Sequence, residues 1–293
     1  MRVALKKNFY LLIIMLISKK LIELDKQGEL DSVLTQFKKE INEKTFLGAG
    51  GDASAFLCKG GHQVIKICAK ESKNNYFQNF SQKNGKIVTA KEFQKHVTKL
   101  QPFLLPIEEI VYDDENIWIY KQSFCRRFEK HKMDLKSLIT IFEMVYHFLS
   151  QANIINSISA HNLGIFEGNN SDSVGLKGNN SDSVGLKGNN LVMFDYHGLH
   201  PVIWDKNEKW WEQTLRHLTE YISVLFAKHK RRQYEKRMRF LSSDLIKDFE
   251  KDGLLPIYFI NFLKFCVDST AEIPKDRFLK LLGQCILHLR EEQ

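Results

Sequence analysis

The hydrophobic pattern of this chain changes its period near residue 130, and this change constrains the fold more than any other feature. Before that point, apolar residues occur in short runs of strand length: "FLGAGGDASAFLC", "HQVIKICA", "EEIVYDD" and "NIWIYKQ". After it they recur every three or four positions, as in "DLKSLITIFEMVYHFLSQANI". Short runs predict β-strands, and the longer period predicts amphipathic helices. We therefore expect an α+β protein with a small β-rich lobe at residues 44–122 and a larger helical lobe at residues 123–293.

Residues 1–43 are expected to form an N-terminal helical extension, because residues 19–41 also carry a helical pattern. The apolar stretch from Phe9 to Ile17 is too short to span a bilayer, and no small-x-small cleavage site follows it. Three interpretations remain open for it. It forms a buried or amphipathic helix, it makes peripheral membrane contact through residues 8–18, or the true start of the protein is Met15.

Composition narrows the class of protein and its compartment. The chain has 293 residues, of which 43% are hydrophobic and 27% charged, as in ordinary globular proteins. Its five cysteines show no CxxC spacing, which argues against a disulfide framework or a zinc site and favours a reducing, cytoplasmic location. The net charge of +8 favours an acidic partner without choosing among nucleotide, nucleic acid and membrane.

One basic run bears on nucleic acid. The segment "KHKRRQYEKRMRF" holds seven Lys or Arg residues from Lys228 to Arg239, with Tyr234 as its internal aromatic residue. Such a run is typical of a solvated helix face, and one aromatic residue gives little support for base stacking. We do not expect nucleic acid to be a partner.

Two places in the first half carry candidate chemistry. The glycines of "GAGG", residues 48–51, separate two predicted strands; they either close a plain hairpin or let backbone N–H groups approach a phosphate. Lys66 interrupts the apolar run "QVIKICA". It is either an edge-strand lysine facing solvent or a buried charge that requires a partner.

Two further candidates lie in the second half. Asn162 occurs in "HNLGIF", and Asp195 ends the apolar run "LVMFD" and is followed by turn residues. Each residue alone is compatible with a structural role, such as capping a turn.

The order and spacing of these four groups resemble the protein-kinase family. The shared pattern is a glycine loop, a strand lysine 18 residues after Gly48, a helix, the strand "IWIYKQ", a long helix, an asparagine and a strand-end aspartate. The resemblance implies a two-lobed kinase-like fold that binds ATP with Mg²⁺ or Mn²⁺. It also implies that the loop covers the phosphates, the lysine holds them, a helix glutamate pairs with the lysine, and the asparagine and aspartate bind the metal. On this chain the roles fall to Gly48, Ala49, Gly50, Gly51, Lys66, Glu92, Asn162 and Asp195, with Glu71 as the alternative to Glu92.

A tandem repeat explains the one spacing that does not fit. Asn162 and Asp195 are 33 positions apart, whereas the family separates these ligands by about 13. The unit "NNSDSVGLKG" occurs twice between them, at residues 169–188, and removing its 20 residues leaves 13. The junction would read "LGIFEGNNLVMFDYHG", two strands joined by a tight turn. We interpret the repeat as an expanded hairpin loop; a binding or phosphoacceptor loop is the alternative.

The chain departs from the family on the substrate side. Ser157 stands where kinases carry the catalytic-base aspartate, five positions before the metal-binding asparagine, and no aspartate lies between Asp134 and Asp172. His161 is either a substitute base or a structural residue. "DYHG" takes the place of Asp-Phe-Gly, and no Ala-Pro-Glu motif follows it. The resemblance therefore implies that ATP binding is retained while the apparatus for the second substrate is reduced.

Two functions remain open. The first is an Mg-ATP-dependent phosphotransferase acting on protein Ser or Thr, or on a small molecule such as a sugar or lipid core, with Ser157 at the base position. The second is a pseudokinase that binds nucleotide and regulates partners without transfer. Short, divergent kinases of large DNA viruses and intracellular bacteria are similar in their brevity. If this chain comes from such a source, we expect delivery to a host cell.

Overall fold

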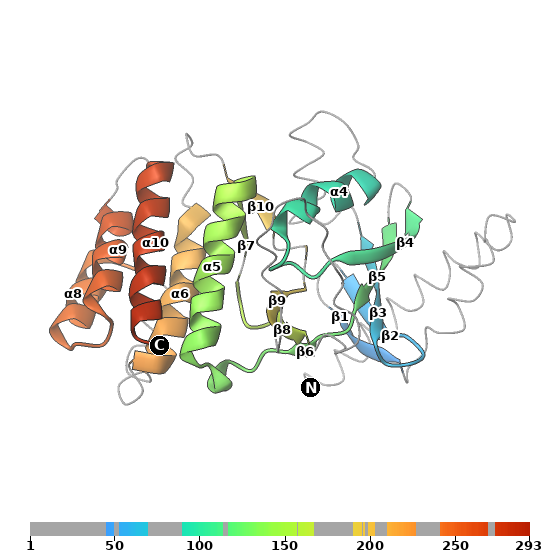
Figure 1. Ribbon diagram of the computed structural model, residues 1–293, viewed down its shortest axis with the longest axis horizontal. Helices are drawn as coiled ribbons and strands as arrows, with labels where there is room; N and C mark the ends of the chain where they lie inside the picture. The colour runs from blue at the N-terminus through green and yellow to red at the C-terminus, as the bar shows by residue number, and fades with distance from the viewer. Residues whose placement is uncertain are drawn as a thin grey trace, which may run out of the picture. The chain divides into compact units, whose positions relative to one another are not determined.

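The computed structural model describes residues 45–49, 53–69, 90–113, 117–156, 158–166, 190–194, 196, 199–202, 210–226, 241–268 and 273–293. They form an α+β protein in which an antiparallel sheet precedes a mainly helical region (Figure 1), so the predicted fold class is confirmed. They cluster into two compact units.

The predicted extension at 1–43, the repeat at 169–188 and the basic run at 228–239 lie outside the described residues. Within the described ranges, no helix combines the length and apolar character needed to cross a membrane.

The first unit comprises the described residues up to Gln94 together with Pro106–Phe124. Its centre is a five-stranded antiparallel sheet with the order β1-β2-β3-β5-β4. The strands are β1 (Phe46–Ala49), β2 (Ala53–Leu57), β3 (Gln63–Ala69), β4 (Ile107–Asp113) and β5 (Ile117–Ser123), and the helix α4 (Ala90–Val97) follows β3 in the chain.

Side-chain alternation along β3 divides this sheet into two faces. Ile65 and Ile67 lie on one face and pack with Phe56, Cys58 and Ile119 in an apolar cluster. Lys66, which lies between the two isoleucines in sequence, therefore projects from the opposite face.

The second unit comprises Lys95–Leu105 and Cys125–Gln293. The boundary after Phe124 lies two residues from the one expected at 122, but Lys95–Leu105 also groups with the helical unit. Backbone hydrogen bonds account for this grouping. The Leu105 N–H donates to the Met193 carbonyl at 2.8 Å, and the Met193 N–H donates to the Phe103 carbonyl at 2.8 Å.

Helices make up most of the second unit. The longest, α5 (Leu135–Ala152), begins at Asp134, whose side chain accepts a hydrogen bond from the Ser137 N–H, and ends at Asn153 in the left-handed conformation. Its apolar face is buried, and it packs against α6 and α10 (Figure 1). The other helices are α6 (Trp210–Phe226), α8 (Ser243–Lys251), α9 (Ile257–Asp268) and α10 (Lys275–Glu291).

Two small sheets complete the second unit. One has the order β6-β8-β9, made of β6 (Arg126–Arg127), β8 (Leu163–Phe166) and β9 (Asn190–Met193). The other pairs β7 (Ile154–Asn156) with β10 (Leu199–Pro201). Strands β8 and β9 are antiparallel, with Leu163 opposite Met193 and Phe166 opposite Asn190. The hairpin predicted on either side of the repeat is therefore confirmed.

Candidate functional site

Lys66 is a buried lysine in a central strand. β3 lies between β2 and β5, where Lys66 pairs with Ala55 and Tyr120. The residue is 7% exposed, and its Nζ lies 6.0 Å from the centroid of the Tyr120 ring. The alternative of an edge-strand lysine facing solvent is wrong. A buried ammonium group interacts strongly with any negative charge brought near it, because little water screens the pair.

The glycine-rich turn joins β1 to β2. Gly48 pairs with Ala55 and Ala49 pairs with Ser54, whereas residues 50–52, including Gly50 and Gly51, lie outside the described residues. A Cβ atom built on Gly48 would meet nothing within 4 Å. Packing within the described chain therefore does not require glycine at this position, which leaves room there for a close approach by another molecule.

The predicted partner of Lys66 is on a helix, as expected. Glu92 belongs to α4, which also carries Gln94, and the Gln94 side chain donates a hydrogen bond to the Ile107 carbonyl at 2.7 Å. The side chain of Glu92 is outside the described part of the structure. Its pairing with Lys66 stays a prediction.

The β8–β9 hairpin brings Asn162 close to Phe194, the residue before Asp195. Asn162 immediately precedes β8, and Phe194 immediately follows β9. The Phe194 N–H donates to the Asn162 carbonyl at 3.1 Å. Asp195 itself is outside the described residues, but its neighbour in sequence is thus hydrogen-bonded to the other predicted metal ligand.

The residue after Asp195 is also held in place. Tyr196 is buried, and its hydroxyl group donates a hydrogen bond to the Leu105 carbonyl. The segment that contains Leu105 runs beside β9, where Leu104 and Met193 form a parallel bridge. The two residues that flank Asp195 are therefore fixed by different parts of the second unit, Phe194 by Asn162 and Tyr196 by Leu105.

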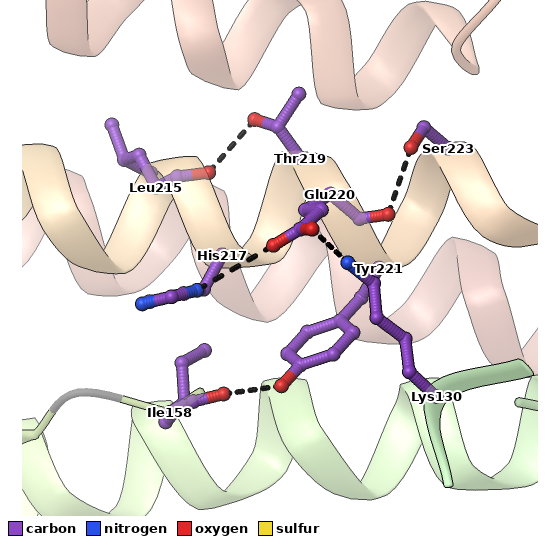
Figure 2. Close-up of polar contacts among 8 residues, drawn as sticks. All are labelled: Lys130, Ile158, Leu215, His217, Thr219, Glu220, Tyr221 and Ser223. Carbon is purple, nitrogen blue, oxygen red and sulfur yellow. Dashed lines mark hydrogen bonds and ion pairs between the residues drawn. The ribbon is translucent and has the colours of Figure 1, made fainter. Parts of the chain in front are cut away.

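Helix α6 holds the loop that leads to Asn162 (Figure 2). The Tyr221 hydroxyl group donates to the Ile158 carbonyl at 2.5 Å, and both residues are buried. Burial raises the pKa of Tyr221, so the hydroxyl group keeps its proton and remains a donor. Ser157, the predicted base position, adjoins Ile158 in sequence and lies outside the described residues.

A second group on α6 anchors the 3₁₀ turn η2 (Lys130–Lys132) (Figure 2). Lys130 forms an ion pair with Glu220, and its Nζ lies 5.8 Å from the centroid of the Tyr221 ring. His217 Nδ1 is 3.7 Å from the other Glu220 oxygen. Burial, with Arg216 and Lys130 adding to it, lowers the pKa of His217 to about 4. Glu220 would oppose this shift, but its charge is already compensated by Lys130, so His217 is neutral at physiological pH.

His161 is engaged by an arginine. The Arg127 guanidinium group contacts His161 Nδ1, and because a guanidinium group can only donate, Nδ1 must accept. A neutral imidazole that accepts at Nδ1 carries its proton at Nε2. While this contact persists, neither ring nitrogen can take up a proton from a substrate, so the structural interpretation of His161 is favoured.

Gly164 lies near the candidate site, and we did not predict its role from the sequence. A Cβ atom there would lie 2.5 Å from Cys125 Sγ, 3.1 Å from the Arg126 carbonyl oxygen and 3.1 Å from Phe194 Cδ1. Glycine thus lets β8 approach β6 and the residue next to Asp195. The sequence did contain a signal, because an isolated glycine inside a strand pattern indicates close backbone approach. No comparable signal distinguishes Tyr221 or Lys130 from other residues of their segments.

The candidate metal ligands are oxygen donors. Among the described residues, no three His, Cys, Asp or Glu side chains gather where a metal ion could be held. Of the predicted pair of ligands, Asn162 and Asp195, the second lies outside the described residues. An amide oxygen and a carboxylate are nevertheless the donors that Mg²⁺ prefers, with water and phosphate oxygens filling its other positions.

Comparison with known proteins gives a distant similarity in fold to solved structures. No protein-family model matches the chain, and no curated protein matches its sequence. Among solved structures, the chain is similar to vaccinia related kinase 3, with a TM-score of 0.47 and 12% sequence identity over 84% of this chain and 88% of that one. This is a distant match in fold to a protein kinase, and it assigns no activity and no residue.

Proposed function

We propose that this chain binds Mg-ATP and is a divergent kinase-like phosphotransferase that acts on Ser or Thr hydroxyl groups of proteins. The observation that carries the proposal is the hydrogen bond from the Phe194 N–H to the Asn162 carbonyl. Asn162 is one predicted metal ligand and Phe194 is the residue before the other, Asp195, so this hydrogen bond supports the proposal that the two ligands lie close together. The burial of Lys66 in the central strand of the other unit gives independent support.

Each residue has a physical task in this proposal. Lys66 supplies a fixed positive charge for the phosphates, and its low exposure limits competition from water. Asn162 and Asp195 would hold the metal ion, which when bound neutralises phosphate charge. Gly48 would leave space for a phosphate beside the β1–β2 turn.

Transfer is expected to be slow. Phosphoryl transfer depends mainly on positioning and charge stabilisation, whereas loss of a general base typically costs on the order of 10²–10⁴-fold in rate. Ser157 cannot accept the hydroxyl proton as a carboxylate would, and His161 Nδ1 is occupied by Arg127. The proton would therefore pass to solvent.

The serine at position 157 and the contact of His161 with Arg127 also favour a second candidate, a pseudokinase. With Ser157 at the base position and His161 engaged, the chain would bind nucleotide and act through partners without transferring phosphate. The second candidate shares the Lys66 site with the first and differs from it in turnover alone.

Incubation with γ-labelled ATP and Mg²⁺ or Mn²⁺ tests the proposal. We expect weak labelling of the protein or of an added acceptor, lost in Asp195→Ala and increased in Ser157→Asp, which restores the carboxylate. Nucleotide binding without labelling in either wild type or Ser157→Asp would leave the pseudokinase. Absence of nucleotide binding would overturn both candidates.

A further inference from the structure

An exposed group of basic side chains lies on β6 and η2 of the second unit. We call Arg126, Arg127, His131 and Lys132 the basic strip; all four are exposed. Phe128, which lies between Arg127 and His131 in sequence, and Met133, which follows Lys132, are both buried within the unit. The strip is therefore the polar surface of a segment whose other face is fixed in the core.

The basic strip already holds a carboxylate, that of Glu129. One Glu129 oxygen lies 2.9 Å from Lys132 Nζ and 3.3 Å from His131 Nε2. Lys132, His131 and Arg126 together lower the pKa of Glu129, with the Lys132 hydrogen bond as the largest cause. Three basic side chains from different positions thus surround one carboxylate at the surface. Glu129 is exposed, and exposed ion pairs contribute little to stability, so another carboxylate can replace Glu129 at little cost.

The segment that carries the strip is anchored next to the candidate site. Lys130 lies between Arg127 and His131 in sequence and is not part of the strip. It pairs with Glu220 on α6 (Figure 2). Arg127 contacts His161, the residue before Asn162. β6 also pairs with β8, with Arg127 opposite Gly164. The strip and the loop containing Asn162 therefore belong to one hydrogen-bonded assembly within the second unit.

We propose that the basic strip binds an acidic peptide segment of a partner protein. Its position beside Asn162 would present a nearby Ser or Thr of that partner for phosphorylation; this delivering role, unlike the binding itself, rests on the function proposed above. The guanidinium fork of Arg126 suits carboxylates, and Glu129 shows where one can lie. A nucleic acid is less well matched. Its bases need exposed rings to stack on, and within 126–136 Phe128 is 5% exposed, so the imidazole of His131 is the one exposed ring of this range.

Fluorescence anisotropy without nucleotide tests the binding directly. The probe is a short labelled peptide of glutamate and aspartate around one serine, compared with the same peptide carrying glutamine and asparagine. We expect the acidic peptide to bind and the neutral one not to bind at physiological ionic strength.

Arg126→Gln combined with Lys132→Gln should weaken binding of the acidic peptide roughly five- to tenfold, because two exposed charge contacts are lost. The matched control, Lys251→Gln with Lys280→Gln, removes two exposed lysines elsewhere in the same unit and should leave the affinity within about twofold.

Glu129→Gln should change the affinity for the acidic peptide in the opposite direction. Removing the resident carboxylate should tighten binding of the acidic peptide roughly two- to fivefold, because Lys132 and His131 are then released to the peptide. Asp244→Asn changes the net charge equally at an exposed position on α8 and should have no such effect. If the strip and control variants change the affinity equally, net charge alone explains the effect and the proposal is overturned. Absence of peptide binding would also overturn it. A single-stranded oligonucleotide that binds more tightly than the peptide and is weakened by the strip variant would assign the strip to nucleic acid instead.

Failure of this surface and failure of the proposed function can be told apart. If the chain binds the acidic peptide but not ATP, the strip stands as a docking site and the phosphotransferase proposal falls. If it binds ATP with unchanged affinity in the strip variant but never binds the peptide, the strip proposal falls alone. Where transfer is observed, Arg126→Gln with Lys132→Gln should raise the KM for an acidic acceptor several-fold and leave kcat nearly unchanged.

Discussion

At the scale of single residues, two polar side chains of α6 hold neighbouring segments: Tyr221 holds the loop before Asn162, and Glu220 holds η2. Tyr221 reaches the Ile158 carbonyl with its hydroxyl group, and Lys130 reaches Glu220. Neither contact touches the proposed ligands. Both act by fixing the backbone on which Asn162 and the basic strip depend.

Removing the Tyr221 hydroxyl group should measurably destabilise the protein. In Tyr221→Phe the buried Ile158 carbonyl loses its donor, which typically costs about 1–3 kcal/mol of unfolding free energy. Denaturant unfolding measures this loss. Tyr258→Phe is the control, because the Tyr258 hydroxyl group makes a long, exposed contact of 3.4 Å with Glu292, and it should cost less than about 0.5 kcal/mol. Equal costs for the two variants would show that the Ile158 contact contributes nothing special.

His217 should make stability fall as the pH is lowered. Its pKa is about 4 in the folded protein, against 6.5 for an ordinary exposed histidine, so the unfolded chain binds more protons between these two values. The contribution is complete above pH 6.5 and is lost as the pH falls toward 4, by about 2 kcal/mol between pH 7 and pH 5. Urea unfolding at both pH values should show a smaller difference in His217→Gln than in wild type. An unchanged pH dependence in His217→Gln would contradict the assignment.

At this scale the sequence identifies residues of an unusual type for their position, but it does not tell which groups they contact. Lys66 was identifiable because a charge inside an apolar run is costly, but choosing between edge and buried positions required the order of strands. Tyr221 and Glu220 carried no signal, since a helical pattern gives a buried face without saying which carbonyl or ammonium group lies opposite.

At the scale of elements, the β8–β9 hairpin is the central device. It places Asn162 at the start of one strand and Phe194 at the end of the other, so the register of the hairpin fixes their hydrogen bond. Gly164 sets how closely this hairpin lies to β6. The sequence predicted both strands through the spacing restored by removing the repeat. It could not predict β6, whose two exposed arginines have no apolar pattern.

Gly164→Ala should destabilise the hairpin. The new Cβ atom would lie 2.5 Å from Cys125 Sγ and 3.1 Å from a backbone oxygen, and such overpacking typically costs about 1–3 kcal/mol. Thermal unfolding measures the cost. Cys125→Ala in the same chain removes the nearest atom and should recover part of it. Gly283→Ala on α10 is the control; its Cβ would lie 3.6 Å from Tyr146, and the substitution should stabilise the helix by up to about 1 kcal/mol.

Excision of residues 169–188 should leave the hairpin intact. The chain between Phe166 and Asn190 would then be Glu167, Gly168 and Asn189, a length that closes an antiparallel hairpin. Because loop-closure entropy grows only logarithmically with length, the unfolding free energy should change by less than about 2 kcal/mol. Calorimetry of the shortened protein checks this. A large drop in melting temperature, or loss of a binding partner, would support the alternative of a functional loop.

At the scale of the whole molecule, the change of hydrophobic period was sufficient for the fold class. Strand-length runs gave the five-stranded sheet and longer periodic segments gave α5 and the later helices. The division of the chain was less predictable, because Lys95–Leu105 belongs to the helical unit through hydrogen bonds of Phe103 and Leu105 to Met193. A boundary set by contacts between distant segments leaves no mark in local composition.

Calorimetric titration of Mg-ATP tests whether Lys66 belongs to a nucleotide site. We expect binding by the wild type and at least about tenfold weaker binding by Lys66→Met, because one charge-assisted contact is lost. The fold should persist in this variant, because methionine fills a similar volume without a buried charge. Lys121→Met removes a more exposed lysine from β5 of the same sheet and should bind as the wild type does. Equal affinity in Lys66→Met and Lys121→Met, or no binding by the wild type, would contradict the account.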